Sequence, residues 1–234
     1  MSNINVLKRD GTIEDLNLEK VHKMVEFAVE GLAGVSASQV EIQSGLQFCD
    51  GIRSADIQEI LIRSASDLIS EEHPNYQYVA ARLLLFGLRK AVHGHPEILP
   101  PLLEHVKGCV DKGVYDGTIV NRYSEEEWDR IDSFVDHERD YLFTYAGLRQ
   151  VVDKYLVQDR SSGEHYESPQ QMYIMISATL FANYPTETRL DYVRRYYNAI
   201  STHKINIPTP IMGGVRTPIR QFASCVLVDI DDTL

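Results

Sequence analysis

Three cysteines are the residues of this chain best suited to redox or nucleophilic chemistry. Cys49, Cys109 and Cys225 are widely separated, so they form neither a metal-ligand spacing nor a disulfide framework, a usage typical of a reducing compartment. Cys225 follows Ser224 and opens an apolar run over 225–228, which predicts a buried strand with the thiol at its mouth. Such a cysteine is either a small buried hydrophobic residue or a reactive thiol, and its residue type leaves both readings open.

Four basic residues could bind phosphate. Lys8 and Arg9 adjoin a predicted turn, Lys20 lies near the start of a predicted helix, and Lys90 lies near the end of another. A nucleoside triphosphate brings about four negative charges, which these side chains could meet from three directions. The alternative is that Lys8 and Arg9 form a solvated corner beside the turn.

The segment 136–140, Asp-His-Glu-Arg-Asp, has the residue types of a metal or acid–base site. It holds a single histidine, and no second histidine lies nearby at ligand spacing. A solvated helix face of mixed charge is the favoured interpretation, and we expect this chain to bind no metal itself.

Composition limits the classes of function. The chain has 234 residues, 44% of them hydrophobic, which allows one or two domains. Its formal charge of −11 argues against an extended nucleic-acid-binding face. No apolar run approaches the length of a membrane span, and the first residues have no leader pattern, so we expect a cytoplasmic protein, in the host cytoplasm if the source is viral.

Patterning predicts a hairpin on a small four-helix bundle at the start of the chain. Asp10-Gly11 is a strong hairpin signal within 6–16, and Asn17 is expected to cap the helix that follows. The other helices are predicted over 38–48, from a cap at Ser54, and over 76–90, before His93-Gly94-His95-Pro96 ends the last one.

The rest of the chain is predicted to be mainly helical, with small β elements. Prolines make 96–101 a linker, and capping boxes at Ser124 and Ser168 open two helices. Further predictions are a helix over 102–112, a hairpin around Ser162-Gly163, a buried helix over 172–181 and a helix over 190–202. Residues 207–211 are predicted to form a short strand or a strand-to-loop transition, and 225–228 a strand. The fold class is therefore mainly α with small β elements (α+β).

Residues 6–20 resemble the signature of the ATP-cone, V-x-K-R-[DN]-G-x-x-[EV]-x-[FYLI]-x-x-x-K. This resemblance implies an allosteric site for ATP and dATP, with magnesium accompanying the nucleotide. By position, the implied contacts are Lys8, Arg9, Glu14, Asn17, Lys20, Ser54 and Lys90. Gln58 and Gly87 stand where relatives inhibited by dATP often have histidines, and Ser54 replaces a threonine. These departures put inhibition by dATP in question more than nucleotide binding.

Residues 208–228 resemble the start of the catalytic barrel in the large (α) subunit of class I ribonucleotide reductase, with its pattern PTP…G-x-R-T-P…Q-x-[SA]-S-C-x-L. The resemblance implies that Cys225 is one of two reducing thiols and that Thr209 and Ser224 hold the substrate. It also implies a specificity effector site at Asp232, Thr233 and Leu234. Arg216 and Thr217 are assigned to the local turn.

The resemblance also implies a domain plan and partners. Residues 1–95 would be the ATP-cone, 96–204 a helical domain, and 205–234 the first strands of an incomplete ten-stranded α/β barrel. The radical cysteine and the second reducing cysteine would lie beyond Leu234, so the chain is expected to come from a divided gene or to be a fragment, inactive alone. Expected partners are a complementary chain carrying the remaining barrel, a small (β) subunit whose di-metal site supplies the radical, and a thioredoxin- or glutaredoxin-type reductant, with no nucleic acid or membrane.

Two other functions remain open on the sequence. One is a non-catalytic ATP-cone module that senses nucleotides for a partner, and the other is a helical interaction protein that binds no nucleotide. The stretch from Pro208 to Cys225 favours the reductase, because a sensor has no use for it.

Overall fold

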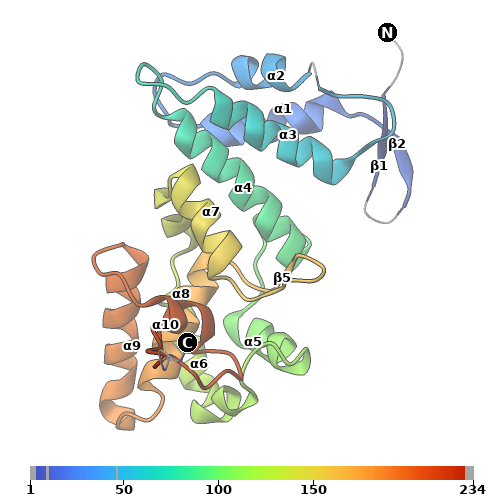
Figure 1. Cartoon of the computed structure of the whole chain (residues 1–234). Coiled ribbons are helices and arrows are strands. Elements are labelled where there is room, and N and C mark those ends of the chain that lie inside the picture. The colour runs from blue at the N-terminus through green and yellow to red at the C-terminus, as the bar shows by residue number, and fades with distance from the viewer. Residues whose placement is uncertain (1–3, 9–10, 46, 230–234) are drawn as a thin grey trace, which may run out of the picture. The chain divides into compact units, whose positions relative to one another are not determined.

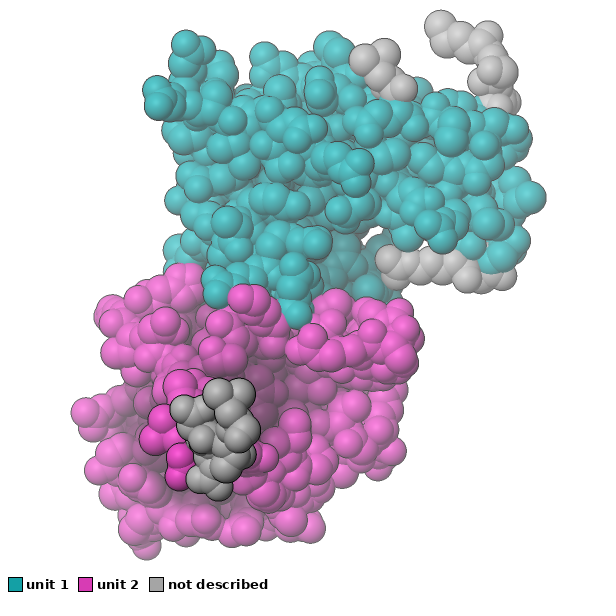
Figure 2. Space-filling model, viewed as in Figure 1, with its two compact units in different colours: residues 1–99, 138–153 teal, residues 100–137, 154–234 magenta. Residues whose placement is uncertain are grey.

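The computed structural model describes residues 4–8, 11–45 and 47–229. The chain divides into two compact units: Met1–Leu99 with Glu138–Asp153, and Pro100–His137 with Lys154–Leu234 (Figure 2). This partition differs from the predicted division at residues 95 and 204, because the segment 138–153 joins the first unit. The three-domain plan stays a prediction.

The first unit begins with a small sheet. β1 (Asn5–Leu7) and β2 (Ile13–Asp15) are antiparallel, with Val6 opposite Glu14, so the predicted hairpin is confirmed. Gly11 in the connection has φ of 85°, a conformation that favours glycine. β3 (Ile52–Arg53) pairs in parallel with β1 and was not predicted, since two residues are too few to show an alternating pattern.

Four helices complete the predicted bundle of the first unit (Figure 1). They are α1 (Leu18–Val29), α2 (Ala37–Gly45), α3 (Ser54–Asp67) and α4 (Tyr76–His93). The Asn17 side chain caps α1 by accepting a hydrogen bond of 2.9 Å from the Lys20 N–H, as predicted. Ser54 is the first residue of α3 rather than its cap, which is Arg53.

The segment 138–153 is tied to α4 by a buried ion pair. It contains most of the 3₁₀ helix η2 (His137–Leu142) and of α7 (Tyr145–Lys154). Asp140 is 1% exposed, and its carboxylate accepts a hydrogen bond of 2.8 Å from the Arg89 guanidinium. The prediction of a solvated face over 136–140 is therefore wrong at Asp140, because a distant arginine compensates its charge inside the unit.

The second unit is helical apart from one hairpin. Its elements are α5 (Leu102–Asp111), the 3₁₀ helix η1 (Gly117–Arg122), α6 (Glu125–Asp132), β4 (Gln158–Asp159), β5 (Glu164–His165), α8 (Pro169–Phe181), α9 (Thr186–Ser201) and α10 (Thr209–Gly214). The hairpin and both capping boxes are confirmed. α8 is buried from Pro169 to Ala178, which confirms the buried helix for most of its length.

Two predicted strands at the end of the chain are wrong. Residues 209–214 form α10, because Pro210 lies in the first helical turn, where its missing N–H costs no hydrogen bond. Residues 225–228 form no regular element and are exposed, and Leu227 is fully so. A strand needs a neighbour for its ladder, and the described part of the chain offers none there. The mainly α class is confirmed, and the described residues contain no barrel strand.

None of the described helices is both long and apolar enough to cross a bilayer.

Candidate functional site

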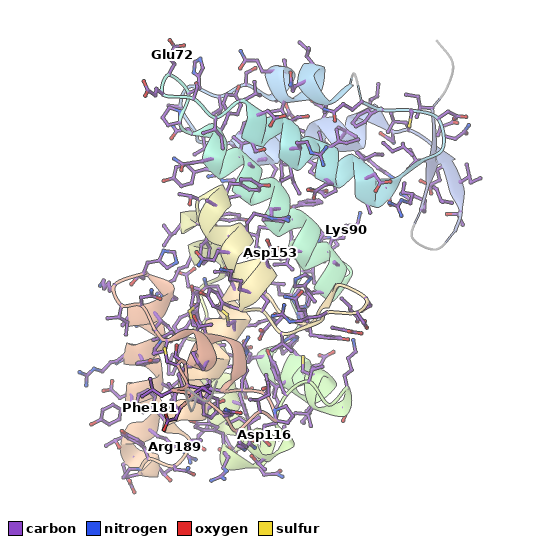
Figure 3. All side chains as sticks on the ribbon, viewed as in Figure 1. Glu72, Lys90, Asp116, Asp153, Phe181 and Arg189 are labelled. Atoms are coloured by element: carbon purple, nitrogen blue, oxygen red, sulfur yellow. The ribbon has the colours of Figure 1, made fainter. Side chains whose placement is uncertain are left out.

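A pocket of about 390 Å³ lies in the first unit between the hairpin and the bundle. Its wall is formed by β1, β2, one face of α1 as far as Phe27, the start of α3 and the second half of α4, together with Glu97. Six of the seven residues predicted to contact a nucleotide line it: Lys8, Glu14, Asn17, Lys20, Ser54 and Lys90, the last labelled on α4 in Figure 3. Arg9, the seventh, lies outside the described residues.

The pocket is locally positive although the chain as a whole is acidic. Four lysines line it, namely Lys8, Lys20, Lys23 and Lys90, against the three carboxylates of Glu14, Asp15 and Glu97. The Lys8 ammonium lies 3.3 Å from a Glu14 carboxylate oxygen across the hairpin, which holds both side chains at the pocket. An anion that enters can therefore meet several ammonium groups at once.

Two helix starts add to this field. Asn17 and Lys20 lie at the N-terminus of α1, and Ser54 is the first residue of α3. The N-cap of α3, Arg53, makes no side-chain capping hydrogen bond. Backbone N–H groups at a helix start carry partial positive charge, so these two starts favour a phosphate.

The other part of the wall is apolar. Phe27 of α1 and Phe86 of α4 line it, and the remaining apolar members are Val6, Leu16, Val21, Met24 and Ile57. An apolar wall with aromatic rings beside a cluster of ammonium groups suits a ligand that has one flat apolar end and one anionic end.

Gln58, which lines the pocket, is a neighbour of Gly87 on α4. The Gln58 amide donates a 2.7 Å hydrogen bond to the Leu83 carbonyl. A Cβ atom at position 87 would come 3.0 Å from Gln58 Cγ. The two residues are therefore sterically matched, because Gln58 occupies space that a side chain at position 87 would need.

Sequence reasoning missed several lining residues, among them Lys23, Phe27, Phe86 and Glu97. Lys23 and Phe27 follow Lys20 at helical spacing and share its face of α1, a signal that could have identified them. Glu97 comes from the proline-rich linker, and only the fold brings it here.

The residues predicted to act on substrate lie in the second unit. Thr209 is the exposed first residue of α10, whereas Ser224 and Cys225 are exposed in the irregular segment after it. Within the described residues, no hydrogen bond joins Thr209 to either of them. Asp232, Thr233 and Leu234 lie outside the described residues.

Arg216 lies in the turn after α10, as assigned from the sequence, and its side chain is also a buried charge. It is 1% exposed, and its guanidinium makes two hydrogen bonds to the Glu167 carboxylate, one of them 2.7 Å long from Nε. The local assignment missed this partner because Glu167 lies just before α8, far away in sequence. Thr217 also belongs to the turn, since its N–H and hydroxyl both donate to the Gly214 carbonyl.

Comparison with known proteins finds two family matches in the chain. Residues 4–91 match the ATP cone domain, and residues 141–220 match the ribonucleotide reductase all-alpha domain. The chain is 55% identical over 229 residues to the ribonucleoside-diphosphate reductase subunit alpha of Haemophilus influenzae, covering 98% of this chain and 30% of that protein. The chain belongs to the ribonucleotide reductase α-subunit family.

Two further members of the reductase α-subunit family show the same coverage. The ribonucleoside-diphosphate reductase 1 subunit alpha of Escherichia coli K12 is 53% identical over 232 residues, 99% of this chain and 30% of that protein. The subunit alpha of Enterobacteria phage T4 is 42% identical over 236 residues, 100% of this chain and 31% of that protein. The chain thus spans about 30% of the length of these reductase subunits.

The two matched segments divide the candidate residues. Every residue that lines the pocket except Glu97 falls inside the ATP cone match. Glu167, Thr209 and Arg216 fall inside the reductase all-alpha match, whereas Ser224 and Cys225 lie just beyond it. Among the described residues of this chain, no cluster of three or more His, Cys, Asp or Glu side chains could hold a metal ion.

Proposed function

We propose that this chain supplies the allosteric nucleotide site and part of the substrate-binding surface of a ribonucleoside-diphosphate reductase α subunit. The observation that carries the proposal is the pocket of the first unit. Six residues identified by their positions in a sequence pattern line one cavity, and that cavity lies in the segment that matches the ATP cone domain.

In this proposal the ligand is ATP or dATP, accompanied by magnesium. Lys8, Lys20 and Lys90, together with Arg9, hold the triphosphate, and the starts of α1 and α3 add their partial charges. Asn17 and Ser54 provide polar contacts, and Glu14 keeps Lys8 in place. The base packs against the apolar wall that contains Phe27 and Phe86.

The second part of the proposal concerns ribonucleotide reduction. Cys225 acts as one of two reducing thiols, which end joined in a disulfide as the substrate's 2′-hydroxyl leaves as water. Thr209 and Ser224 position the substrate, and Asp232, Thr233 and Leu234 belong to a specificity effector site. A thioredoxin- or glutaredoxin-type protein then reduces the disulfide, and a small subunit with a di-metal site supplies the radical.

Further polypeptide must complete the catalytic barrel, in keeping with the three-part plan of 1–95, 96–204 and 205–234. Large apolar side chains are exposed in the last described segment, including Ile219, Phe222 and Leu227. We assign this surface to contact with the remaining barrel, which would bury these side chains.

The nucleotide site can be tested by equilibrium titration of the chain with ATP and with dATP. Because Lys20 lines the pocket, Lys20→Ala should weaken binding about tenfold or more. Lys107→Ala removes an exposed lysine of the second unit and is the matched control, with unchanged binding expected. Absence of saturable binding at millimolar nucleotide would overturn the assignment.

A non-catalytic nucleotide sensor is the second candidate, favoured by the exposure of Cys225 outside the reductase all-alpha match. The deciding experiment mixes the chain with the remaining α polypeptide and a small subunit, and then changes Cys225→Ser. Loss of multiple-turnover reduction supports the thiol role. Undiminished turnover would exclude the thiol role of Cys225 and favour the non-catalytic sensor.

A further inference from the structure

A fully buried ion pair joins the end of α10 to the start of α8. The side chains of Arg216 and Glu167 are both 0% exposed to solvent. Burial alone would lower the pKa of the Arg216 guanidinium, but the adjacent Glu167 carboxylate outweighs it and raises that pKa. The Arg216 guanidinium therefore stays charged at every pH at which the protein is folded.

Every side-chain nitrogen and oxygen atom of the pair has a hydrogen-bond partner. Arg216 also donates to the carbonyls of Met212 and Tyr155, the latter at 2.9 Å. The Glu167 carboxylate accepts hydrogen bonds from the Tyr115 hydroxyl at 2.5 Å and from the Val157 N–H at 2.7 Å. Buried charges are stable only when their remaining donors and acceptors are satisfied, and this cluster meets that condition.

These contacts connect parts of the second unit that are distant in sequence. Tyr115 follows α5, Tyr155 and Val157 precede β4, Glu167 precedes α8, and Met212 lies in α10. The backbone continues the connection, because the Asp116 N–H donates to the Arg216 carbonyl at 2.9 Å. Arg216 is thus the point at which the chain after α10 is fixed to the rest of its unit.

α10 has little means of holding its own orientation. It spans only Thr209–Gly214, and a helix this short is not stable by its own hydrogen bonds. Its buried residues are Met212 and Gly214, near its C-terminal end. Thr209, at the other end, is exposed. The direction in which Thr209 is presented therefore depends on what anchors the C-terminal end.

We propose that Arg216, held by Glu167 and Tyr115, is a positioning residue that orients α10 and thereby places Thr209 against the ribonucleotide. The inference rests on the proposed function in one respect, namely that Thr209 contacts substrate. Arg216 itself touches no substrate. Lysine cannot replace it, because a single ammonium cannot reach the Glu167 carboxylate and two carbonyls in the geometry of the guanidinium.

Amide hydrogen exchange of the whole chain tests the anchoring step without any assay of activity. Arg216→Lys should speed exchange of the Met212 and Val215 amides, both hydrogen-bonded within α10, by about tenfold or more, while α9 amides stay unchanged. Arg220→Lys, which alters the exposed pair with Asp116, is the matched control and should leave α10 unchanged.

Unchanged α10 exchange in Arg216→Lys would overturn the inference, and so would an equal rise across α8 and α9. If Arg216→Lys does not fold, Tyr115→Phe removes only the hydroxyl that donates to Glu167. Its smaller acceleration should again be confined to α10, and its absence counts against the inference.

Steady-state kinetics of the completed reductase tests the positioning step. Arg216→Lys should raise the KM for ribonucleotide about tenfold, and adding Thr209→Ala to it should raise the KM little further, because both changes act through one contact. If Thr209→Ala alone leaves KM unchanged, the proposed substrate role of Thr209 fails. If Thr209→Ala raises KM while Arg216→Lys does not, the positioning inference fails and the substrate role stands.

Discussion

At the scale of single residues, the strongest consequence of the structure concerns the charges inside the second unit. Removing one member of a buried pair leaves the other charge without compensation, which costs about 3–5 kcal/mol. We therefore expect Glu167→Ala to lower the free energy of unfolding by about that amount. An exposed ion pair such as that of Arg220 and Asp116 contributes about 1 kcal/mol or less, so Arg220→Ala should change the free energy of unfolding little.

Urea unfolding monitored by circular dichroism measures both changes. The arginine side chain of the control pair is 62% exposed, which makes Arg220→Ala a direct comparison between a solvated and a buried charge. Similar small losses for the two variants would contradict the buried network.

The three thiols should differ in reactivity. Burial, with a further contribution from the Glu167 carboxylate, raises the pKa of Cys109 to about 12. At pH 8 only roughly one Cys109 in ten thousand would be a thiolate, whereas Cys49 and Cys225 are exposed. Iodoacetamide with mass spectrometry should therefore modify Cys49 and Cys225 well before Cys109. Equal labelling of all three would show that Cys109 is not enclosed.

At the scale of elements, the junction of α6 and α9 should weaken in acid. Glu127 ends the capping box of α6 and accepts a 2.7 Å hydrogen bond from Arg189 of α9. Burial acts to raise the pKa of Glu127, but Arg189 and the Ser124 N–H outweigh it, and the pKa is lowered from 4.5. The stabilisation is therefore fully present above pH 4.5 and is lost as the pH falls through the lower folded value.

The corresponding variant is Glu127→Gln, which retains a capping side chain. At pH 7 it should lose about 1.5–3 kcal/mol of unfolding free energy, and the difference from wild type should shrink below the folded pKa. Glu125→Gln is the matched control in the same turn. A difference that does not change between pH 7 and pH 3 would refute the pairing.

The nucleotide pocket should communicate with η2. Phe27 lines the pocket, and its ring meets that of Tyr141 edge to face at 6.0 Å between centroids. Tyr141 also lies against the guanidinium groups of Arg82 and Arg89. Because these contacts are continuous, a nucleotide that orders Phe27 should slow amide exchange in η2.

Exchange with and without saturating ATP measures this coupling. Tyr141→Leu should abolish the protection of η2 while ATP still binds, and Tyr145→Leu in α7 is the control that should retain it. Protection of η2 that survives Tyr141→Leu would mean that another route carries it.

Local sequence patterns predicted most helices and hairpins correctly. The wrong predictions fell where contacts between residues distant in sequence determine the structure. The capping boxes and hairpins depend on residues close in sequence, so Asn17 and Ser124 could be assigned correctly. Prolines around Thr209 are compatible with an extended segment or a helix start, and only packing selects between them. Likewise, Asp140 and Arg216 have partners 51 and 49 residues away, which no local pattern contains.

The candidate site shows the same division. Lys8 and Lys20 could be predicted because a sequence pattern marks them, whereas most of the apolar wall and Glu97 required the fold. The steric match between Gln58 and Gly87 could not be predicted from the sequence either, because the two residues lie on different helices.

At the scale of the whole molecule, each unit is assigned a separate task. The first has a positive pocket in a chain of net charge −11, so its attraction for anions is local. The second fixes α10 through a buried ion pair, and its proposed task is to present Thr209 in one orientation. The proposed task of the first unit requires that a nucleotide occupy its pocket.

A crystal structure of the chain grown with ATP is the most direct test of that claim. We predict a triphosphate in contact with Lys8, Lys20 and Lys90, with the base against the wall formed by Phe27 and Phe86. A nucleotide bound elsewhere on the chain, with this pocket empty at saturating ATP, would contradict it.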